Sequence, residues 1–152
     1  MANSYSPHDL LAMTDADLDK IFGAASPGPI PSGEAQGTAL IDPGTSRSHE
    51  MAVLVNHFAW QGKVFDPENG TLVNHISVFG IKAILAKVYQ GASWVDQKPC
   101  IVLDYSQTSL VAKHVRDEIR NIAPNVYLGP VYWDKKRLFY FSLHFGQART
   151  DQ

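Results

Sequence analysis

The chain has 152 residues, a length at which one hydrophobic core, and therefore one domain, is expected. Its 13 Lys and Arg residues nearly balance 15 Asp and Glu residues, and a formal net charge of -2 argues against a nucleic acid or an anionic membrane as partner. A single cysteine, Cys100, excludes an internal disulfide and a thiolate zinc site. The first residues lack the pattern of a secretory signal, and no apolar run approaches about 18 residues, so we expect a cytoplasmic protein.

Two helix-start signals lie in the first 25 residues. Ser6-Pro7-His8-Asp9 combines a capping serine, a proline at the first helical position and an acid three residues after the cap. Thr14-Asp15-Ala16-Asp17 repeats the cap and the acid, and apolar residues follow both signals. We therefore predict that residues 1–25 form a helical strap, which packs on a sheet edge and shields its hydrogen-bonding groups.

The next segments predict a loop, a strand and a helix. Residues 26–33 contain three prolines and two glycines, which exclude a helix and favour turns. Residues 36–41 read as a strand that an Asp-Pro-Gly turn signal ends. From Thr45 or Ser46 to about Phe58, apolar residues at helical spacing predict a helix.

The remainder of the chain predicts hairpins and one long helix. Alternating apolar runs bounded by Gly, Pro, Asn and Asp are typical of strands joined by tight turns. Three such hairpins are expected: residues 60–65 with 71–76, 84–95 with 99–105, and 126–133 with 137–145. Between the last two, the segment Thr108–Ile122 shows the apolar spacing of a helix.

About seven strands, mostly consecutive, favour an antiparallel sheet curled into a barrel over a doubly wound parallel fold. The predicted class is α+β, a small antiparallel β-barrel with an N-terminal helical strap and two further helices. We expect the strap at residues 1–25, a single barrel domain at 26–146 and a tail at 147–152. A barrel of about eight strands has an interior large enough for side chains or one small ligand.

Two short motifs resemble the bacterial GXWXG domain, which carries a Gly-x-Trp-x-Gly motif and a downstream Trp-x-Gly-Lys-x-Phe block. Residues 33–37 read Gly-Glu-Ala-Gln-Gly, with Ala35 where the family has tryptophan, and residues 60–65 read Trp-Gln-Gly-Lys-Val-Phe. The segment 102–145 is similar to the domain of unknown function that usually follows GXWXG. The resemblance implies a small lipocalin-like, or calycin-like, barrel and supplies no catalytic residues.

Asp104 and Tyr105 end a strongly apolar strand, and by alternation one of the two side chains points inward. A carboxyl group in an apolar interior has a raised pKa and can donate a proton near neutral pH. The alternative for Asp104 is a hydrogen bond to backbone amides of the turn at Ser106 and Gln107. We treat both Asp104 and Tyr105 as candidate catalytic residues.

His114 and Asp117 are a reserve pair, because residues three apart are neighbours on the surface of a helix. A histidine oriented by a carboxylate is a standard general acid or base. The alternative is a solvated helix face that also carries Arg116 and Arg120.

Lys87 interrupts an otherwise apolar strand. If it lines the cavity, desolvation lowers its pKa, and it can act as a base or form a Schiff base. If it faces outward, it is a solubilising residue.

The last hairpin supplies an aromatic wall whose orientation depends on its turn. A three-residue turn groups Tyr127 with Phe139 and Phe141, whereas a two-residue turn groups Tyr132 with them, because a slip of one residue reverses every side chain. Such a wall is ordinarily core, and in a ligand site the tyrosine hydroxyls are its polar handles. The candidate substrate-binding residues are Trp60, Lys87, Tyr127, Tyr132, Phe139 and Phe141.

The histidines show no His-x-His or His-Glu-x-x-His spacing, so no metal and no cofactor is expected. The first functional hypothesis is a cofactor-independent isomerase, lyase or cyclase that uses acid–base catalysis on a small apolar oxygenated substrate, such as a terpenoid epoxide or an aromatic ketide. The alternative is a binding protein for a fatty acid, isoprenoid or haem, and a third is a structural domain with a filled barrel. A homodimer is compatible with all three.

Overall fold

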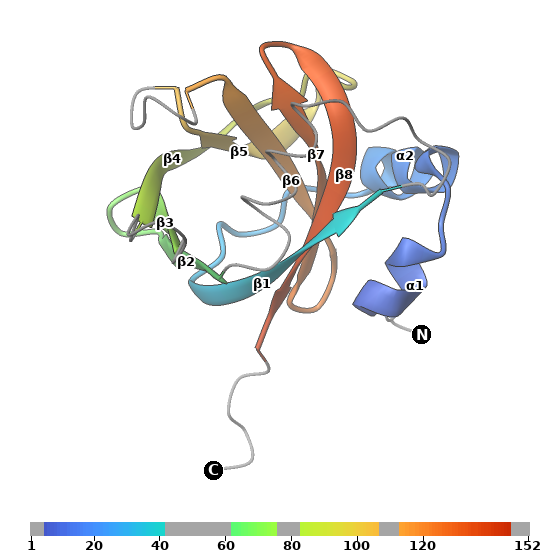
Figure 1. The fold of residues 1–152 in the computed structure, drawn as a ribbon, viewed down its shortest axis with the longest axis horizontal. Helices are drawn as coiled ribbons and strands as arrows, with labels where there is room; N and C mark the ends of the chain where they lie inside the picture. The colour runs from blue at the N-terminus through green and yellow to red at the C-terminus, as the bar shows by residue number, and fades with distance from the viewer. Residues whose placement is uncertain (1–4, 42–61, 76–82, 107–112, 147–152) are drawn as a thin grey trace.

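A computed structural model describes residues 5–41, 62–75, 83–106 and 113–146 (Figure 1). Eight antiparallel strands from these residues close into a barrel, in which every strand pairs with its neighbours in sequence and the last pairs with the first. The strands are β1 (Gly33–Leu40), β2 (Gly62–Asp66), β3 (Thr71–His75), β4 (Ala83–Ala92), β5 (Pro99–Asp104), β6 (Val115–Ala123), β7 (Val126–Trp133) and β8 (Lys136–Phe145). The predicted α+β barrel is confirmed.

Two short helices form at the predicted N-terminal signals: α1 (Pro7–Leu11) and α2 (Asp15–Ala24). Ser6 and Thr14 each accept a hydrogen bond from the backbone N–H three residues on, and Asp9 and Asp17 accept one from the backbone N–H of the cap, so both ends are capping boxes. Neither helix, within the described ranges, has the length and apolar character to cross a membrane.

The strap covers the outside of the barrel, not a sheet edge. A closed barrel has no free edge to protect, because every strand has two hydrogen-bonded neighbours. Figure 1 shows both helices beside β8 and β1. Their apolar side packs on a cluster that the barrel presents outward, and the buried members are Leu10, Leu18, Phe22, Leu40, Cys100, Val102, Leu128 and Tyr140.

The inside of the barrel is a second, larger apolar cluster. Alternation places every other residue of each strand inward. Its buried members are Ala35, Phe65, Leu72, Ala86, Val88, Ile101, Leu103, Tyr105, Val115, Ile119, Tyr127, Val131, Phe139, Phe141 and Leu143. Two layers thus meet at the wall of the barrel, one inside it and one beneath the strap.

The long helix predicted at Thr108–Ile122 is wrong, because residues 115–123 form strand β6. Val115 and Ile119 satisfy both a helical spacing and an alternating one, so periodicity alone does not separate the two. The structure shows a strand: β5 and β7 pair with the segment on either side. Val115 and Ile119 face the barrel interior, and the β4–β5 turn and the strap cover Glu118 and Arg120 on the other face. The other predicted helix, at about residues 46–58, lies outside the described ranges.

The last hairpin combines both predicted registers. Its turn holds two residues, Asp134 and Lys135, with φ of 57° and 107°. A bulge beside Val131 then shifts the pairing by one residue, so that Val131 faces Phe139. As a result Tyr127, Phe139 and Phe141 lie inside the barrel, which is the grouping predicted for a three-residue turn.

At Gly129, strand β7 lies unusually close to the backbone of β6. A Cβ atom added to it would overlap the backbone carbonyl of Glu118 on β6. The next residue, Pro130, has no N–H to donate to the ladder. Only glycine allows β7 to lie this close to the strand that carries the candidate site below.

Candidate functional site

Among the described residues, polar groups enter the largely apolar interior from Lys63 on β2, Tyr105 directly after β5 and Asp117 on β6. All three are fully buried, with relative exposures of 0%. Buried Lys and Asp residues are rare unless they are paired or functional. We call these three residues the barrel triad.

The topology of the barrel brings the barrel triad together. Antiparallel order places the start of β2, the end of β5 and the start of β6 at one end of the barrel, which we call the site end. In the closed ring β2 and β6 lie on opposite sides. The long Lys63 side chain reaches from β2 to the residue that follows β5, where its Nζ lies 3.3 Å from the Tyr105 hydroxyl oxygen.

The electrostatics of the barrel triad follow from burial. Burial raises the pKa of Asp117 to about 7, an effect that Lys63 partly opposes and Glu118 adds to. Burial lowers the pKa of Lys63 to about 7, against the pull of Asp117. Burial, followed by the charge of Asp117, also raises the pKa of Tyr105. Near neutral pH, Asp117 and Lys63 therefore compete for a proton.

Asp117 also has unused hydrogen-bonding capacity. Neither of its carboxyl oxygens has a hydrogen-bond partner among the residues that the structure describes. A buried polar group without a partner costs free energy, of the order of 1–3 kcal/mol and more when it is charged. An oxygenated ligand inside the barrel would supply the missing contact.

The pair lowers stability most near neutral pH. Between about pH 4 and 7 the unfolded chain has lost the Asp117 proton that the folded chain keeps, so stability falls as pH rises. Above pH 7 the unfolded chain keeps the Lys63 proton that the folded chain loses, so stability recovers. The pair therefore opposes folding most strongly near neutral pH.

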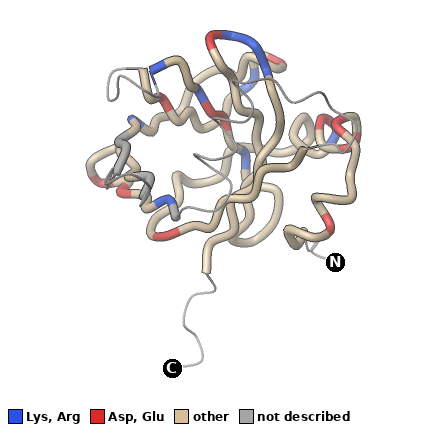
Figure 2. Tube along the Cα trace, in the orientation of Figure 1, with Lys and Arg blue, Asp and Glu red and all other residues tan. Residues whose placement is uncertain are grey.

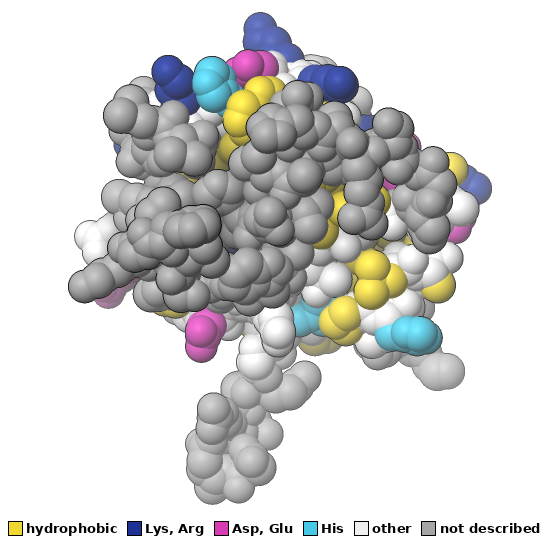
Figure 3. Space-filling model, viewed as in Figure 1, with side chains coloured by type: hydrophobic (Ala, Val, Ile, Leu, Met, Phe, Trp, Pro, Cys, Tyr) yellow, Lys and Arg dark blue, Asp and Glu magenta, His cyan; other side chains and the backbone are white. Residues whose placement is uncertain are grey.

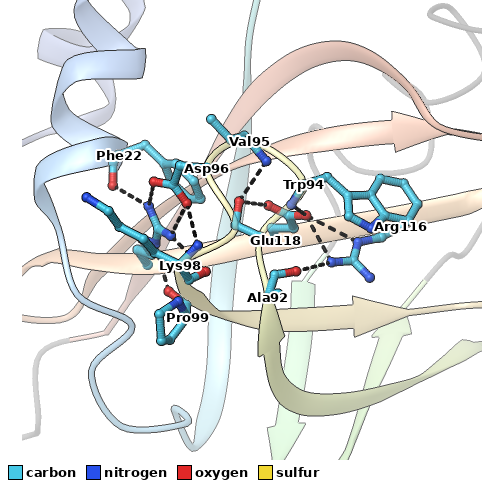
Figure 4. Close-up of polar contacts among 11 residues, drawn as sticks. Phe22, Ala92, Trp94, Val95, Asp96, Lys98, Pro99, Arg116 and Glu118 are labelled. Atoms are coloured by element: carbon cyan, nitrogen blue, oxygen red, sulfur yellow. Dashed lines mark hydrogen bonds and ion pairs between the residues drawn. The ribbon is translucent and has the colours of Figure 1, made fainter.

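The outer face of β6 is held by a polar network (Figure 4). Glu118 is fully buried and accepts hydrogen bonds from the Ser93 hydroxyl at 2.6 Å, the Trp94 backbone N–H at 2.8 Å and the Arg116 guanidinium at 3.0 Å. Arg116 also lies over the Trp94 ring, 4.1 Å from its centroid. These contacts tie the β4–β5 turn to β6, the strand whose inner face carries Asp117.

Asp104 and Tyr105 point to opposite sides, as predicted, and Tyr105 is the inward one. Asp104 accepts hydrogen bonds from the Ser106 backbone N–H at 2.8 Å and the Tyr89 hydroxyl at 3.1 Å. Burial opposes ionisation, but these bonds outweigh it and lower the pKa of Asp104. The turn-capping interpretation of Asp104 is therefore the one observed, and a raised pKa was wrong.

His114 and Asp117 do not meet, because residues three apart on a strand point to opposite faces. His114 is partly exposed, with its Nδ1 2.8 Å from an Asp134 carboxyl oxygen and its ring stacked on Trp133. It lines a surface cavity of about 290 Å³ together with Lys113 and Lys135. Figure 3 shows a histidine next to basic and acidic side chains at the top of the molecule. In the same orientation, Figure 2 shows the charged residues of the β7–β8 turn at the top.

The predicted substrate-binding residues divide between the two faces. Lys87 is exposed on the outer face of β4, because neighbouring residues of a strand point to opposite faces and Ala86 and Val88 point inward. The predicted role of Lys87 in the cavity is therefore wrong. Tyr132 also points outward, and its ring meets the Trp94 ring edge to face, with the two ring centroids 4.9 Å apart. Phe139 and Phe141 line the interior. Trp60 lies outside the described residues.

Tyr127 lies inside the barrel but at the end opposite the barrel triad. Its hydroxyl donates a hydrogen bond to the Pro29 carbonyl at 2.7 Å, and both residues line a cavity of about 490 Å³ with Phe145. The loop before β1 therefore crosses this end of the barrel.

Lys63 was missed as a site residue. The available signal was its alternation with Phe65, which places a lysine on the same strand face as an inward phenylalanine. Within the described ranges, no group of three His, Cys, Asp or Glu side chains could hold a metal ion.

Comparisons with known proteins support the fold. No family model and no curated protein matches the chain. A crystal structure of a protein from Thermomonospora curvata is similar, with a TM-score of 0.58 and 13% sequence identity over 89% of each chain. At this identity the likeness shows the fold alone. The resemblance to the GXWXG domain stays a prediction.

Proposed function

We propose that this protein is a cofactor-independent isomerase, lyase or cyclase, which acts by acid–base catalysis on a small apolar oxygenated substrate inside the barrel. A terpenoid epoxide or an aromatic ketide has the required chemistry. The observation that carries the proposal is Asp117, a fully buried carboxyl group without a hydrogen-bond partner among the described residues, which faces the same interior as Lys63.

Each member of the barrel triad has a distinct role in this proposal. Asp117 donates a proton to, or removes one from, the substrate at the point where its charge changes. Lys63 holds the compensating charge, so the interior stays neutral through the reaction. Tyr105, whose hydroxyl lies 3.3 Å from the Lys63 Nζ, orients the substrate oxygen and remains protonated because its pKa is raised.

The second candidate function is a binding protein for a fatty acid, an isoprenoid or haem. The apolar interior with its phenylalanine wall favours it, since small-molecule pockets are mostly apolar with few polar groups. A binding protein needs only one polar side chain to bind the head group of its ligand. It leaves unexplained why a lysine and a carboxyl group are buried together at a cost to stability.

Proton transfer can be tested without knowing the natural substrate. The protein is incubated in D₂O with carvone, an apolar ketone, and separately with limonene 1,2-epoxide, and products are followed by mass spectrometry. We expect deuterium incorporation beside the ketone carbonyl or opening of the epoxide. The rate should fall on both sides of about pH 7, because the active pair carries one proton.

The control is the heat-denatured protein at the same concentration. Rates equal to that control with both probes, together with an unmodified apolar ligand in native mass spectra of the purified protein, would favour the binding function instead.

A further inference from the structure

The amine of Lys63 is placed as a nucleophile. It is fully buried, it reaches across the barrel from β2, and apolar side chains such as Leu103 and Phe65 belong to the same interior cluster. A lysine in such surroundings is neutral more often than one in water, and the neutral amine is the form that attacks carbonyl groups.

We propose that Lys63 forms a reversible imine with an apolar aldehyde or ketone bound inside the barrel. The inference rests on the proposed function, since both place the substrate oxygen among the same three side chains. It narrows the substrate class from oxygenated hydrocarbons in general to carbonyl compounds.

The chemistry balances with the groups present. The Lys63 nitrogen forms a bond to the carbonyl carbon, and the nitrogen's proton passes to the carbonyl oxygen to give a carbinolamine. Asp117 in its protonated form then donates to the hydroxyl group, the C–O bond breaks and water leaves. The product is an iminium ion whose positive charge is balanced by the Asp117 carboxylate, and hydrolysis reverses every step.

The apolar residues of the barrel interior determine which substituents the carbonyl compound can carry. Around the barrel triad, the described inward residues are aliphatic or aromatic, among them Val115, Phe139 and Leu103. A hydrocarbon chain or ring is stabilised there by about 25 cal/mol per Å² of buried apolar surface. A polar aldehyde such as glyceraldehyde gains nothing from this wall.

The test is reductive trapping. The wild-type protein is incubated at about pH 7 with octanal and sodium cyanoborohydride, and the modified lysines are located by peptide mass mapping. We expect one octyl group on Lys63, formed at least about 10-fold faster than on the exposed Lys87, Lys135 and Lys136, because these three do not lie beside the apolar wall that would hold octanal.

Glyceraldehyde serves as the matched probe, and Lys87→Met as the matched variant. Glyceraldehyde should show no preference for Lys63, and Lys87→Met should be trapped at Lys63 as the wild type is. An unmodified Lys63 in a wild-type protein whose exposed lysines are alkylated would overturn the imine.

The two proposals fail separately. If Lys63 stays unmodified while carvone still exchanges deuterium, the imine is wrong and acid–base catalysis stands. If Lys63 is trapped while neither carvone nor limonene 1,2-epoxide reacts, the imine is supported and the acid–base proposal is wrong.

Discussion

Replacement of Asp117 by asparagine is expected to lower the rate of deuterium exchange or epoxide opening by about 10²- to 10⁴-fold. The substitution removes the group that moves the proton and keeps the shape of the side chain. It breaks no hydrogen bond to a described residue, because the carboxyl oxygens have none. The fold should therefore survive, and circular dichroism with thermal unfolding checks this directly.

Asp134→Asn is the matched control for this variant. Asp134 is an exposed carboxylate on the β7–β8 turn, and its partner is His114. Activity should be unchanged in Asp134→Asn. Wild-type rates in a folded Asp117→Asn protein would remove Asp117 from the reaction.

Replacement of Arg120 by methionine is expected to reduce the free energy of unfolding by about 3–5 kcal/mol. Arg120 is fully buried beneath the strap and donates to both carboxyl oxygens of Asp96, at 2.8 and 2.9 Å. It also donates to the carbonyls of Phe22, Lys98 and Pro99 (Figure 4). Methionine fills the space but removes the two hydrogen bonds to Asp96 and the three to backbone carbonyl groups.

Arg137→Met is the matched comparison, because Arg137 also links the barrel to α2. Its guanidinium lies 2.9 Å from an Asp19 carboxyl oxygen, and the two side chains are 37% and 39% exposed. An exposed pair contributes about 0–1 kcal/mol. Urea unfolding of both variants measures the difference in the free energy of unfolding. Equal decreases in the two variants would show that burial of Arg120 adds nothing to its contribution to stability.

Local signals in the sequence predicted much of the fold. The capping boxes at Ser6 and Thr14 need only neighbouring residues, so the strap helices are recognisable without the barrel. The Asn-Gly step before β3 likewise fixes a hairpin by its own turn chemistry. Strand order then follows, since each hairpin joins neighbours in a closed ring.

Segment β6 shows why the rest could not be predicted. Its alternate residues Arg116, Glu118 and Arg120 look like a solvated face, but the β4–β5 turn and the strap bury them in ion pairs. A helix was therefore predicted for residues whose polar side is not in water. Arg116 and Glu118 pair with each other, but their other partners and all those of Arg120 lie about 20 or more residues away and cannot be read from spacing.

The candidate site was predictable only in part. Tyr105 was expected inward from strand alternation, and it is. Asp117 was named for the wrong reason, as a helical partner of His114. Its true neighbour, Lys63, belongs to a strand on the far side of the barrel, and only closure of the sheet brings the two together.

A ¹³C NMR titration of the aspartate side-chain carboxyl groups tests the central claim, which is that Asp117 and Lys63 share a proton inside the barrel. Asp117 should titrate at about pH 7, and Lys63→Met should move its midpoint upward, because Lys63 lowers the pKa of Asp117. Asp96 is the internal reference, since its hydrogen bonds to Arg120 hold its pKa at about 2 and its signal should stay constant above about pH 4. An Asp117 signal that titrates near pH 4, unchanged by Lys63→Met, would contradict the account.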